Sequence, residues 1–80
     1  MPEVADIRTA AVDAVREVAG VTVSDDDSIV SSGMIDSLSI LTLIASIERK
    51  LGIRLKTTGL QPDDFDNIDL IVETVLRAKV

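Results

Sequence analysis

The sequence predicts an all-α fold, a small bundle of three to four helices with a long loop between the first and the second helix. Its 80 residues are enough for one domain, residues 1–80, with a single core. Hydrophobic residues make up 46% of the chain, and the only aromatic residue is Phe65, so the core must be mainly aliphatic. Apolar residues recur at helical spacing in three segments, which are separated by stretches rich in Ser, Asp, Thr and Gly.

The first helix is expected to begin at Pro2 and Glu3 and to end at Gly20. Proline at the first helical position loses no needed hydrogen bond, and an acid there interacts favourably with the helix dipole. Glycine is a common C-terminal cap. The expected inner stripe of this helix consists of Val4, Ile7, Ala11, Ala14 and Val18.

Residues 21–36, VTVSDDDSIVSSGMID, show no sustained period and are expected to form the long loop. Loops of this length in compact domains are often functional. The side chains expected to reach the core from it are Val21, Val23, Ile29 and Val30.

The second helix is expected to start at Asp36 or Ser37, either of which can cap it, and to end at Gly52. Its apolar side chains cover an arc of about 220°, roughly twice what burial in a small bundle requires. Some apolar surface should therefore remain exposed. The apolar set is Leu38, Ile40, Leu41, Leu43, Ile44, Ala45, Ile47 and Leu51, and the narrow polar strip is Ser39, Thr42, Ser46, Arg49 and Lys50.

The segment IRLKTTGLQPDDF predicts a second connection, with a short helical turn around Asp63 to Asp66. Asp66 or Asn67 is expected to cap the last helix. The inner stripe of that helix is expected to contain Ile68, Ile71, Val72, Val75 and Leu76.

Composition excludes several classes of function. The net charge of −6 makes nucleic acid an unfavourable partner. Without cysteine there is no disulfide framework or thiolate metal site, and the consecutive Asp25, Asp26 and Asp27 lack the alternate spacing of a calcium loop, so no metal site is expected. No apolar run is long enough to span a bilayer, and no secretion segment is visible, so we expect a cytoplasmic protein.

Ser37 stands between an acid and a long apolar run, but the sequence provides no means of activating it. A serine nucleophile needs a base, usually histidine, and the chain has none. The lysines Lys50, Lys56 and Lys79 have polar, solvent-seeking neighbours, and the glycines of a hydrolase elbow are missing. We therefore expect no catalytic site and no enzyme activity. Taken alone, Asp36-Ser37 is ordinary capping chemistry.

In context, the chain resembles the phosphopantetheine-dependent acyl carrier proteins along nearly its whole length. The resemblance rests on an amphipathic first helix, a long loop ending in GMIDSL, a helix running SILTLIASIERKLGI and a final apolar helix. It implies an acyl-carrier-type bundle, with 4'-phosphopantetheine attached to Ser37 and flanked by Asp36 and Leu38. It also implies a monomer that is modified by a phosphopantetheinyl transferase, loaded by an acyl- or aminoacyl-activating ligase and used by a downstream synthase or acyltransferase.

Partner enzymes of this family dock on the loop and second helix around the serine. The resemblance therefore makes Met34, Leu38, Ile40 and Ile44 candidates for a docking surface, and the alternative for each is a place in the core. Leu38 is expected in the core on balance, and both places remain open for Ile40 and Ile44. Leu41, Ile47 and Leu51 are expected to be core residues.

The second helix departs from carriers of fatty acid synthesis, which usually hold several acids there, because Glu48 is its only acid after Ser37. The segments GMIDSL and LQPDDFDNI look more like stand-alone carriers of dedicated pathways. Such carriers include the D-alanyl carrier of wall teichoic metabolism and those of secondary-metabolite biosynthesis. The function implied is a carrier that holds an acyl or aminoacyl group as a thioester. The alternatives are an unmodified helical protein–protein interaction module and a regulatory subunit that docks through its second helix.

Overall fold

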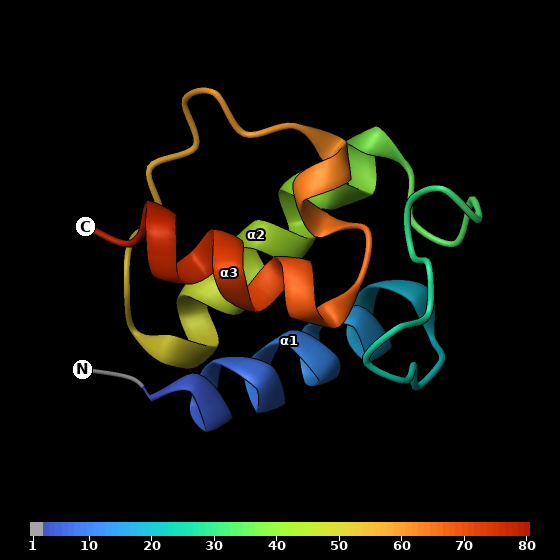
Figure 1. The fold of residues 1–80 in the computed structure, drawn as a ribbon, viewed down its shortest axis with the longest axis horizontal. Helices are drawn as coiled ribbons and strands as arrows, with labels where there is room; N and C mark the ends of the chain where they lie inside the picture. Colours follow the sequence, from blue (N-terminus) through green and yellow to red (C-terminus); the bar gives the residue numbers. More distant parts are fainter. Residues whose placement is uncertain (1–2) are drawn as a thin grey trace.

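The computed structural model describes residues 3–80 and confirms the all-α fold (Figure 1). In chain order its elements are α1 (Val4–Ala19), α2 (Ser37–Leu51), the short 3-10 helix η1 (Pro62–Phe65) and α3 (Ile68–Ala78). The long loop separates α1 from α2, and η1 lies where the sequence predicts a helical turn. Within residues 3–80 the β-structure is limited to an isolated antiparallel bridge between Leu55 and Lys79. The predicted role of Pro2 lies outside the described residues.

The helix ends follow the predicted capping residues. Glu3 is the N-cap of α1, and Gly20 and Gly52 close α1 and α2 in the left-handed conformation, with φ of 79° and 65°. A side chain with a Cβ would be strained there. Of the two alternatives at each later start, Asp36 caps α2 and Asn67 caps α3. Ser37 and Asp66 are therefore left free for other roles.

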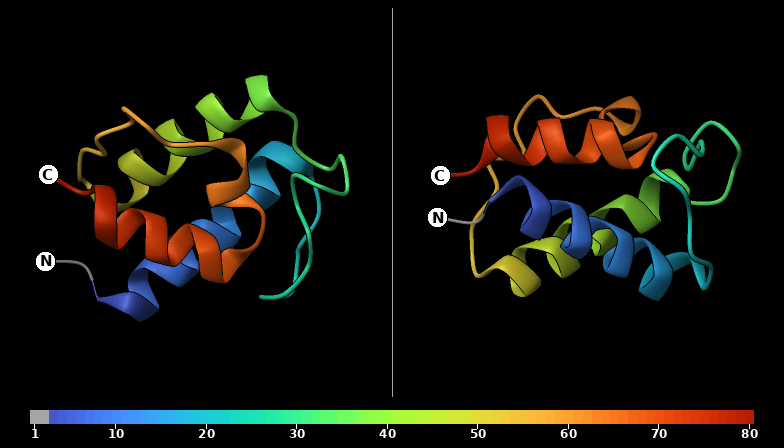
Figure 2. Two further views of the ribbon diagram at one scale, coloured as in Figure 1. Left: turned by 45° about the horizontal axis from the view of Figure 1, so that its top comes forward. Right: turned by 60° about the horizontal axis from the view of Figure 1, so that its bottom comes forward.

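The core lies where α1 packs against both α2 and α3 (Figure 2). It is aliphatic apart from Phe65 of η1, which has the greatest volume among the fully buried side chains. The long loop also enters this core, because Ile29 and Ile35 are at most 1% exposed. Burial of these two side chains fixes the loop at two points before α2 begins.

Several residues predicted in the core are instead exposed. Leu38 is 80% and Leu41 is 65% exposed, whereas Ile40 and Ile44 are each 6% exposed. The reason is that α2 packs against α1 and η1, and the face bearing positions 38, 41 and 45 points away from both. Exposed apolar surface on α2 was expected, and it lies on the candidate Leu38 and on Leu41 rather than on Ile40 and Ile44. Ser46, predicted on the polar strip, is buried.

The remaining corrections concern the ends of other elements. Val4 at the start of α1, Val21 just after α1 and Leu76 in the last turn of α3 are exposed, although each was expected inside. Leu76 is exposed although Val75 and Ala78 on either side of it in the chain are buried, so it lies on the outer side of α3. Periodicity alone does not show where the neighbouring elements pack. Val23 and Ile29 of the long loop and Ile47 of α2 are buried as predicted. The apolar stripe of α3, apart from Leu76, is buried as predicted too. No helix within residues 3–80 combines the length and apolar character needed to cross a membrane.

The exposed position of Leu41 on α2 can be tested by truncating two side chains of this helix. Ile47→Ala removes a fully buried side chain and should lower the free energy of unfolding by about 2–4 kcal/mol through lost burial and a cavity. Leu41→Ala, the matched control, should change it by no more than about 0.5 kcal/mol. Urea denaturation followed by circular dichroism measures both. Equal losses would return Leu41 to the core.

Candidate functional site

Ser37 is the first residue of α2 and is exposed at the end of the long loop. Asp36 holds this helix start, because its Oδ1 accepts a hydrogen bond from Ser39 N at 2.8 Å. Hydrogen bonds from Ser39, with desolvation opposing them, lower the pKa of Asp36. Among residues 3–80 no hydrogen bond to the Ser37 hydroxyl is found, so this group remains open to solvent and to a reactant.

The backbone at this point favours a negatively charged group. The first turn of a helix presents unpaired N–H groups and the positive end of the helix dipole. Helix starts therefore bind phosphate readily. In the first turn of α2, no acidic side chain opposes such a group. A phosphate ester at position 37 would meet the remaining N–H groups of this turn beside the Asp36 carboxylate, which already accepts from one of them.

An apolar groove runs beside Ser37, between α2 and the second connection. It holds about 250 Å³, and no charged side chain lines it. Ile40 and Ile44 are nearly buried and belong to the core. They also form part of the groove wall, so a ligand could contact them only from inside the groove. The lining residues are Ser37, Ile40, Leu41, Ile44, Thr57, Leu60, Gln61, Pro62 and Phe65.

The loop before Ser37 is held by Asp66, a residue for which the sequence suggested only a capping role. Its Oδ1 accepts from the backbone N–H groups of Val30 and Ser31 at 2.9 and 2.8 Å, and its Oδ2 accepts from Ser31 Oγ at 3.0 Å. Its carbonyl oxygen also accepts from Ile29 N at 2.6 Å. Hydrogen bonds from Ser31 are the largest influence that lowers the pKa of Asp66.

The hydrogen bonds of Asp66 are connected to the helix start. Ile35 N donates to Ile29 O at 3.0 Å and closes the loop directly before Asp36. Asp66 therefore fixes the first half of a closed loop whose second half ends at the serine. The one sequence signal for this role is the pair Asp66-Asn67, in which two capping residues precede a helix that needs one.

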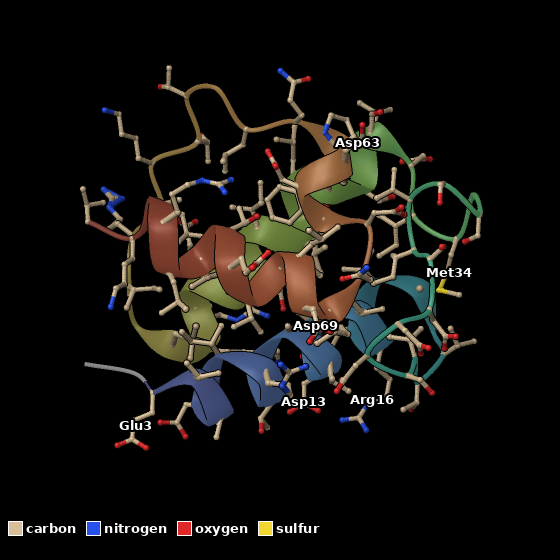
Figure 3. The ribbon with its side chains drawn as sticks, in the orientation of Figure 1. Glu3, Asp13, Arg16, Met34, Asp63 and Asp69 are labelled. Atoms are coloured by element: carbon tan, nitrogen blue, oxygen red, sulfur yellow. The ribbon has the colours of Figure 1, made fainter. Side chains whose placement is uncertain are left out.

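Three exposed apolar side chains lie before and after the serine in the chain. Leu38 and Leu41 are exposed on α2. Met34, 39% exposed, lies on the loop before α2, and its side chain points away from the start of that helix (Figure 3). We call Met34, Leu38 and Leu41 the apolar surface. Exposed apolar patches next to a reactive group are typical of sites where another protein docks.

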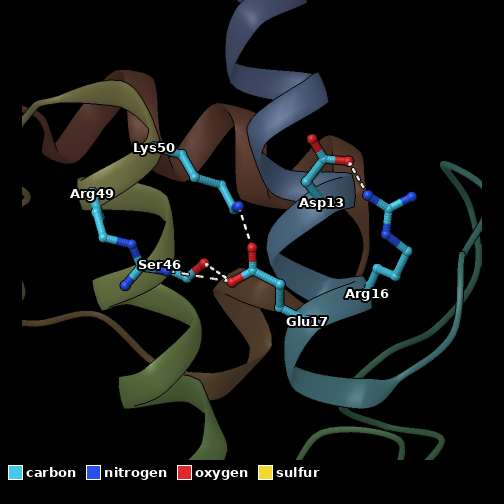
Figure 4. A network of polar contacts seen from close by, with 6 residues as sticks. All are labelled: Asp13, Arg16, Glu17, Ser46, Arg49 and Lys50. Atoms are coloured by element: carbon cyan, nitrogen blue, oxygen red, sulfur yellow. Dashed lines mark hydrogen bonds and ion pairs between the residues drawn. The ribbon is translucent and has the colours of Figure 1, made fainter.

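The cations at the far end of α2 are neutralised by Glu17 of α1 (Figure 4). Its Oε1 accepts from Ser46 Oγ at 3.1 Å and from Arg49 Nη2 at 3.3 Å, and its Oε2 forms an ion pair with Lys50 Nζ. The Lys50 ammonium is the main cause of the lowered pKa of Glu17. Around the serine itself, α2 carries no such cation. Across residues 3–80, no cluster of three or more metal-ligating side chains is found.

Comparisons with known proteins agree with this geometry. The family model of the phosphopantetheine attachment site matches residues 10–75, which include all of α2. A relative, the D-alanyl carrier protein of Streptococcus sanguinis (strain SK36), is 29% identical over 76 residues, covering 92% of this chain and 96% of the relative. No solved structure gives a significant match.

The role of Asp66 can be tested by its effect on stability and its pH dependence. Asp66→Ala leaves the N–H groups of Val30 and Ser31 without their acceptor and should lower the free energy of unfolding at pH 7 by about 2 kcal/mol. Because the pKa of Asp66 is lowered in the folded state, its stabilisation is present above its ordinary pKa and is lost as pH falls through the lowered value. The difference from wild type should therefore shrink in acid, as measured by urea denaturation at a series of pH values.

The neighbouring acid provides the control. Asp63 is exposed in η1, and among the described residues no hydrogen bond of its carboxylate is found. Asp63→Ala removes the same charge and should leave stability nearly unchanged. If the two variants lose equal stability, net charge rather than the loop contacts explains the effect.

Proposed function

Since the chain belongs to the phosphopantetheine attachment family and is a carrier of covalent 4'-phosphopantetheine, we propose that Ser37 is the residue that bears this group. The observation that carries the proposal is the exposed serine at the start of α2 in the sequence Asp36-Ser37-Leu38. Ser31, Ser32 and Ser46 fit less well, since Ser46 is buried against Glu17 and the hydroxyls of Ser31 and Ser32 already donate hydrogen bonds.

The surroundings of Ser37 fit the size and charge of the group. The helix start favours its phosphate, and the apolar groove can take the neutral chain beyond it. Ser37 would hold the group through its oxygen, Asp36 would keep the helix start rigid, and Ile40, Leu41 and Phe65 would contact the chain. When attached, the group supplies a terminal thiol that holds an acyl or aminoacyl cargo as a thioester.

Attachment requires a separate enzyme, because the chain has no histidine and, within residues 3–80, no side chain is hydrogen-bonded to the Ser37 hydroxyl to take its proton. In the transfer, Ser37 Oγ forms a bond to the phosphorus of coenzyme A that bears the pantetheine. The bond from that phosphorus to the nucleotide phosphate breaks, and the 3',5'-bisphosphate nucleotide leaves. The Ser37 proton passes to a base of the transferase, which also supplies the metal ion. The chain is thus a substrate and shuttle rather than an enzyme.

The pathway we propose is a dedicated one, of the D-alanyl or secondary-metabolite type. The named relative is a D-alanyl carrier protein, and α2 lacks the row of acids usual in fatty acid carriers. An activating ligase would load the cargo in the cytoplasm and a downstream synthase or acyltransferase would remove it. The mass of the thioester on the chain isolated from its own cells identifies the cargo.

The apolar surface is the proposed docking site for these enzymes. Of the sequence candidates, Met34 and Leu38 are exposed and remain in it, Leu41 joins them, and Ile40 and Ile44 belong to the core. The side chains of this surface carry no charge, so apolar burial rather than ion pairing should dominate the contact. The same surface would serve an unmodified interaction module, which is the alternative function, and modification of Ser37 separates the two.

Modification is measured by intact mass after incubation with coenzyme A and a broad-specificity phosphopantetheinyl transferase. Wild type should gain one phosphopantetheinyl group, and Ser37→Ala should gain none because the accepting oxygen is gone. Ser39→Ala, two residues away on the same helix, should be modified like wild type. If a control carrier is modified while wild type is not, the interaction module becomes the better interpretation.

Docking is tested by placing a charge on the apolar surface. Leu41→Asp should leave the thermal melt nearly unchanged, because the side chain is 65% exposed, but should slow modification by about tenfold through lost apolar contact. Val4→Asp makes the same change at an exposed site on α1 and should not alter the rate. Equal rates for Leu41→Asp and wild type would remove Leu41 from the docking surface.

A further inference from the structure

The cations of the chain divide into a paired group and an unpaired group. Those in ion pairs with Asp or Glu are Arg8, Arg16, Arg49, Lys50 and Arg77. Among residues 3–80 no ion pair is found for Arg54, Lys56 or Lys79, although the chain has 14 acids for its 8 cations. Because acids outnumber cations in this chain, a shortage of carboxylates does not explain why these three cations have no ion-pair partner.

All three unpaired cations lie at the bridge between Leu55 and Lys79. Lys56 N donates to Ala78 O at 2.8 Å and Val80 N donates to Arg54 O at 3.1 Å, so the second connection and the end of α3 are held side by side. The buried side chain of Leu55 anchors this junction in the core. Because side chains alternate along the bridge, those of Arg54 and Lys56 lie on the face opposite Leu55 and Lys79. The Glu48 carboxylate accepts from Leu55 N at 2.9 Å at the same junction.

A shallow hollow opens at the same place. It holds about 250 Å³, and Lys56, Arg77 and Lys79 contribute to its lining together with the hydroxyl-bearing Thr58. Arg77 has only a 3.5 Å ion pair with Asp64, and its side chain is 61% exposed. No carboxylate side chain lines the hollow. We call Arg54, Lys56, Arg77 and Lys79 the basic surface.

The basic surface lies far from Ser37. The 15 residues of α2 separate the serine from the start of the second connection, a helical length of about 22 Å. In Figures 1 and 2 the C-terminal end of the chain and the loop before α2 occupy opposite ends of the long axis. The acids of that loop, Asp25, Asp26, Asp27 and Asp36, make the serine end negative. Acids also lie at the end that holds both termini, where Glu3 and Asp6 begin α1 and Glu48 Oε2 accepts from Leu55 N at 2.9 Å.

We propose that the basic surface is a docking site for an acidic segment of a partner protein, and that this partner stays bound while the serine end engages another enzyme. Charge complementarity identifies the partner: four cations clustered on an otherwise acidic chain attract an acidic surface and steer its approach. The inference goes beyond the function of Ser37 and does not depend on its modification. It gives the carrier a second contact point that leaves the thioester end accessible.

The geometry favours a protein over other anions. The cations are largely exposed around a shallow hollow, so no buried donors enclose a small anion such as free phosphate. Anionic membranes attract clusters of about four to eight cations, and this surface has the minimum of that range on a chain whose net charge of −6 opposes approach to a negative plane. An acidic segment, in contrast, makes a local contact with the cations.

The experiment uses the unmodified full chain and a fluorescent peptide of eight consecutive glutamates as the probe. Fluorescence anisotropy should show binding that weakens as salt is raised. In 15N NMR spectra the peptide should shift the signals of residues 54–58 and 77–80 and leave those of residues 36–41 unchanged. The rate at which the transferase modifies Ser37 should be unaffected by saturating peptide, which keeps this result separate from the modification test.

Two double variants of equal net charge decide the outcome. Lys56→Gln/Lys79→Gln should weaken peptide binding about tenfold, whereas Arg16→Gln/Arg49→Gln should bind like wild type. An equal loss in both variants, or peptide shifts centred outside the basic surface, overturns the proposal. A second pair of probes is inorganic phosphate and vesicles of phosphatidylcholine and phosphatidylserine. The proposal is also overturned if wild type binds either of these but not the peptide, and the Lys56→Gln/Lys79→Gln variant loses that binding.

Discussion

The structure around Ser37 depends on the hydrogen bonds that Asp66 makes across the chain. Its carboxylate and carbonyl oxygens hold the backbone at residues 29–31, and the Ile35-to-Ile29 hydrogen bond passes that constraint to the start of α2. Burial of Ile29 and Ile35 supports the same loop from the core side. A 17-residue connection between α1 and α2 is thereby given one conformation, and the serine at its end has a defined place although its own hydroxyl is unrestrained.

Helix α2 does three different tasks on three faces. One face packs into the core through Leu43, Ile44 and Ile47, and a second meets α1 through Ser46 and the Glu17 network. The third face, with Leu38 and Leu41, is largely exposed, and Leu41 also lines the groove beside the second connection. A helix that is apolar over more than half its circumference normally lies inside a larger protein. Here that excess of apolar surface stands beside the proposed modification site, where a modifying enzyme would have to come close.

Charge is distributed so that the two ends of the carrier differ. Acids occur along the long loop that ends at Ser37, and three cations without an ion pair within residues 3–80 lie where the second connection meets the end of α3. In the middle, Glu17 and Arg8 join helices through ion pairs, and Arg8 Nη1 reaches both Asp25 and Asp69. The distance between the basic surface and Ser37 would let two partners approach without competing for one surface, as the proposed second docking site requires.

The sequence by itself determined the helices, their caps, the long loop and the position of the serine, because helical periodicity and capping are local properties of neighbouring residues. It also indicated the resemblance to carrier proteins, because that resemblance rests on a short motif in a helical context. Only the tertiary structure decided that Leu41 faces solvent and Ile44 the core, that Asp66 holds the loop, and that Arg54, Lys56 and Lys79 meet. Each of these depends on which elements pack together, and such contacts join residues that lie far apart in the chain.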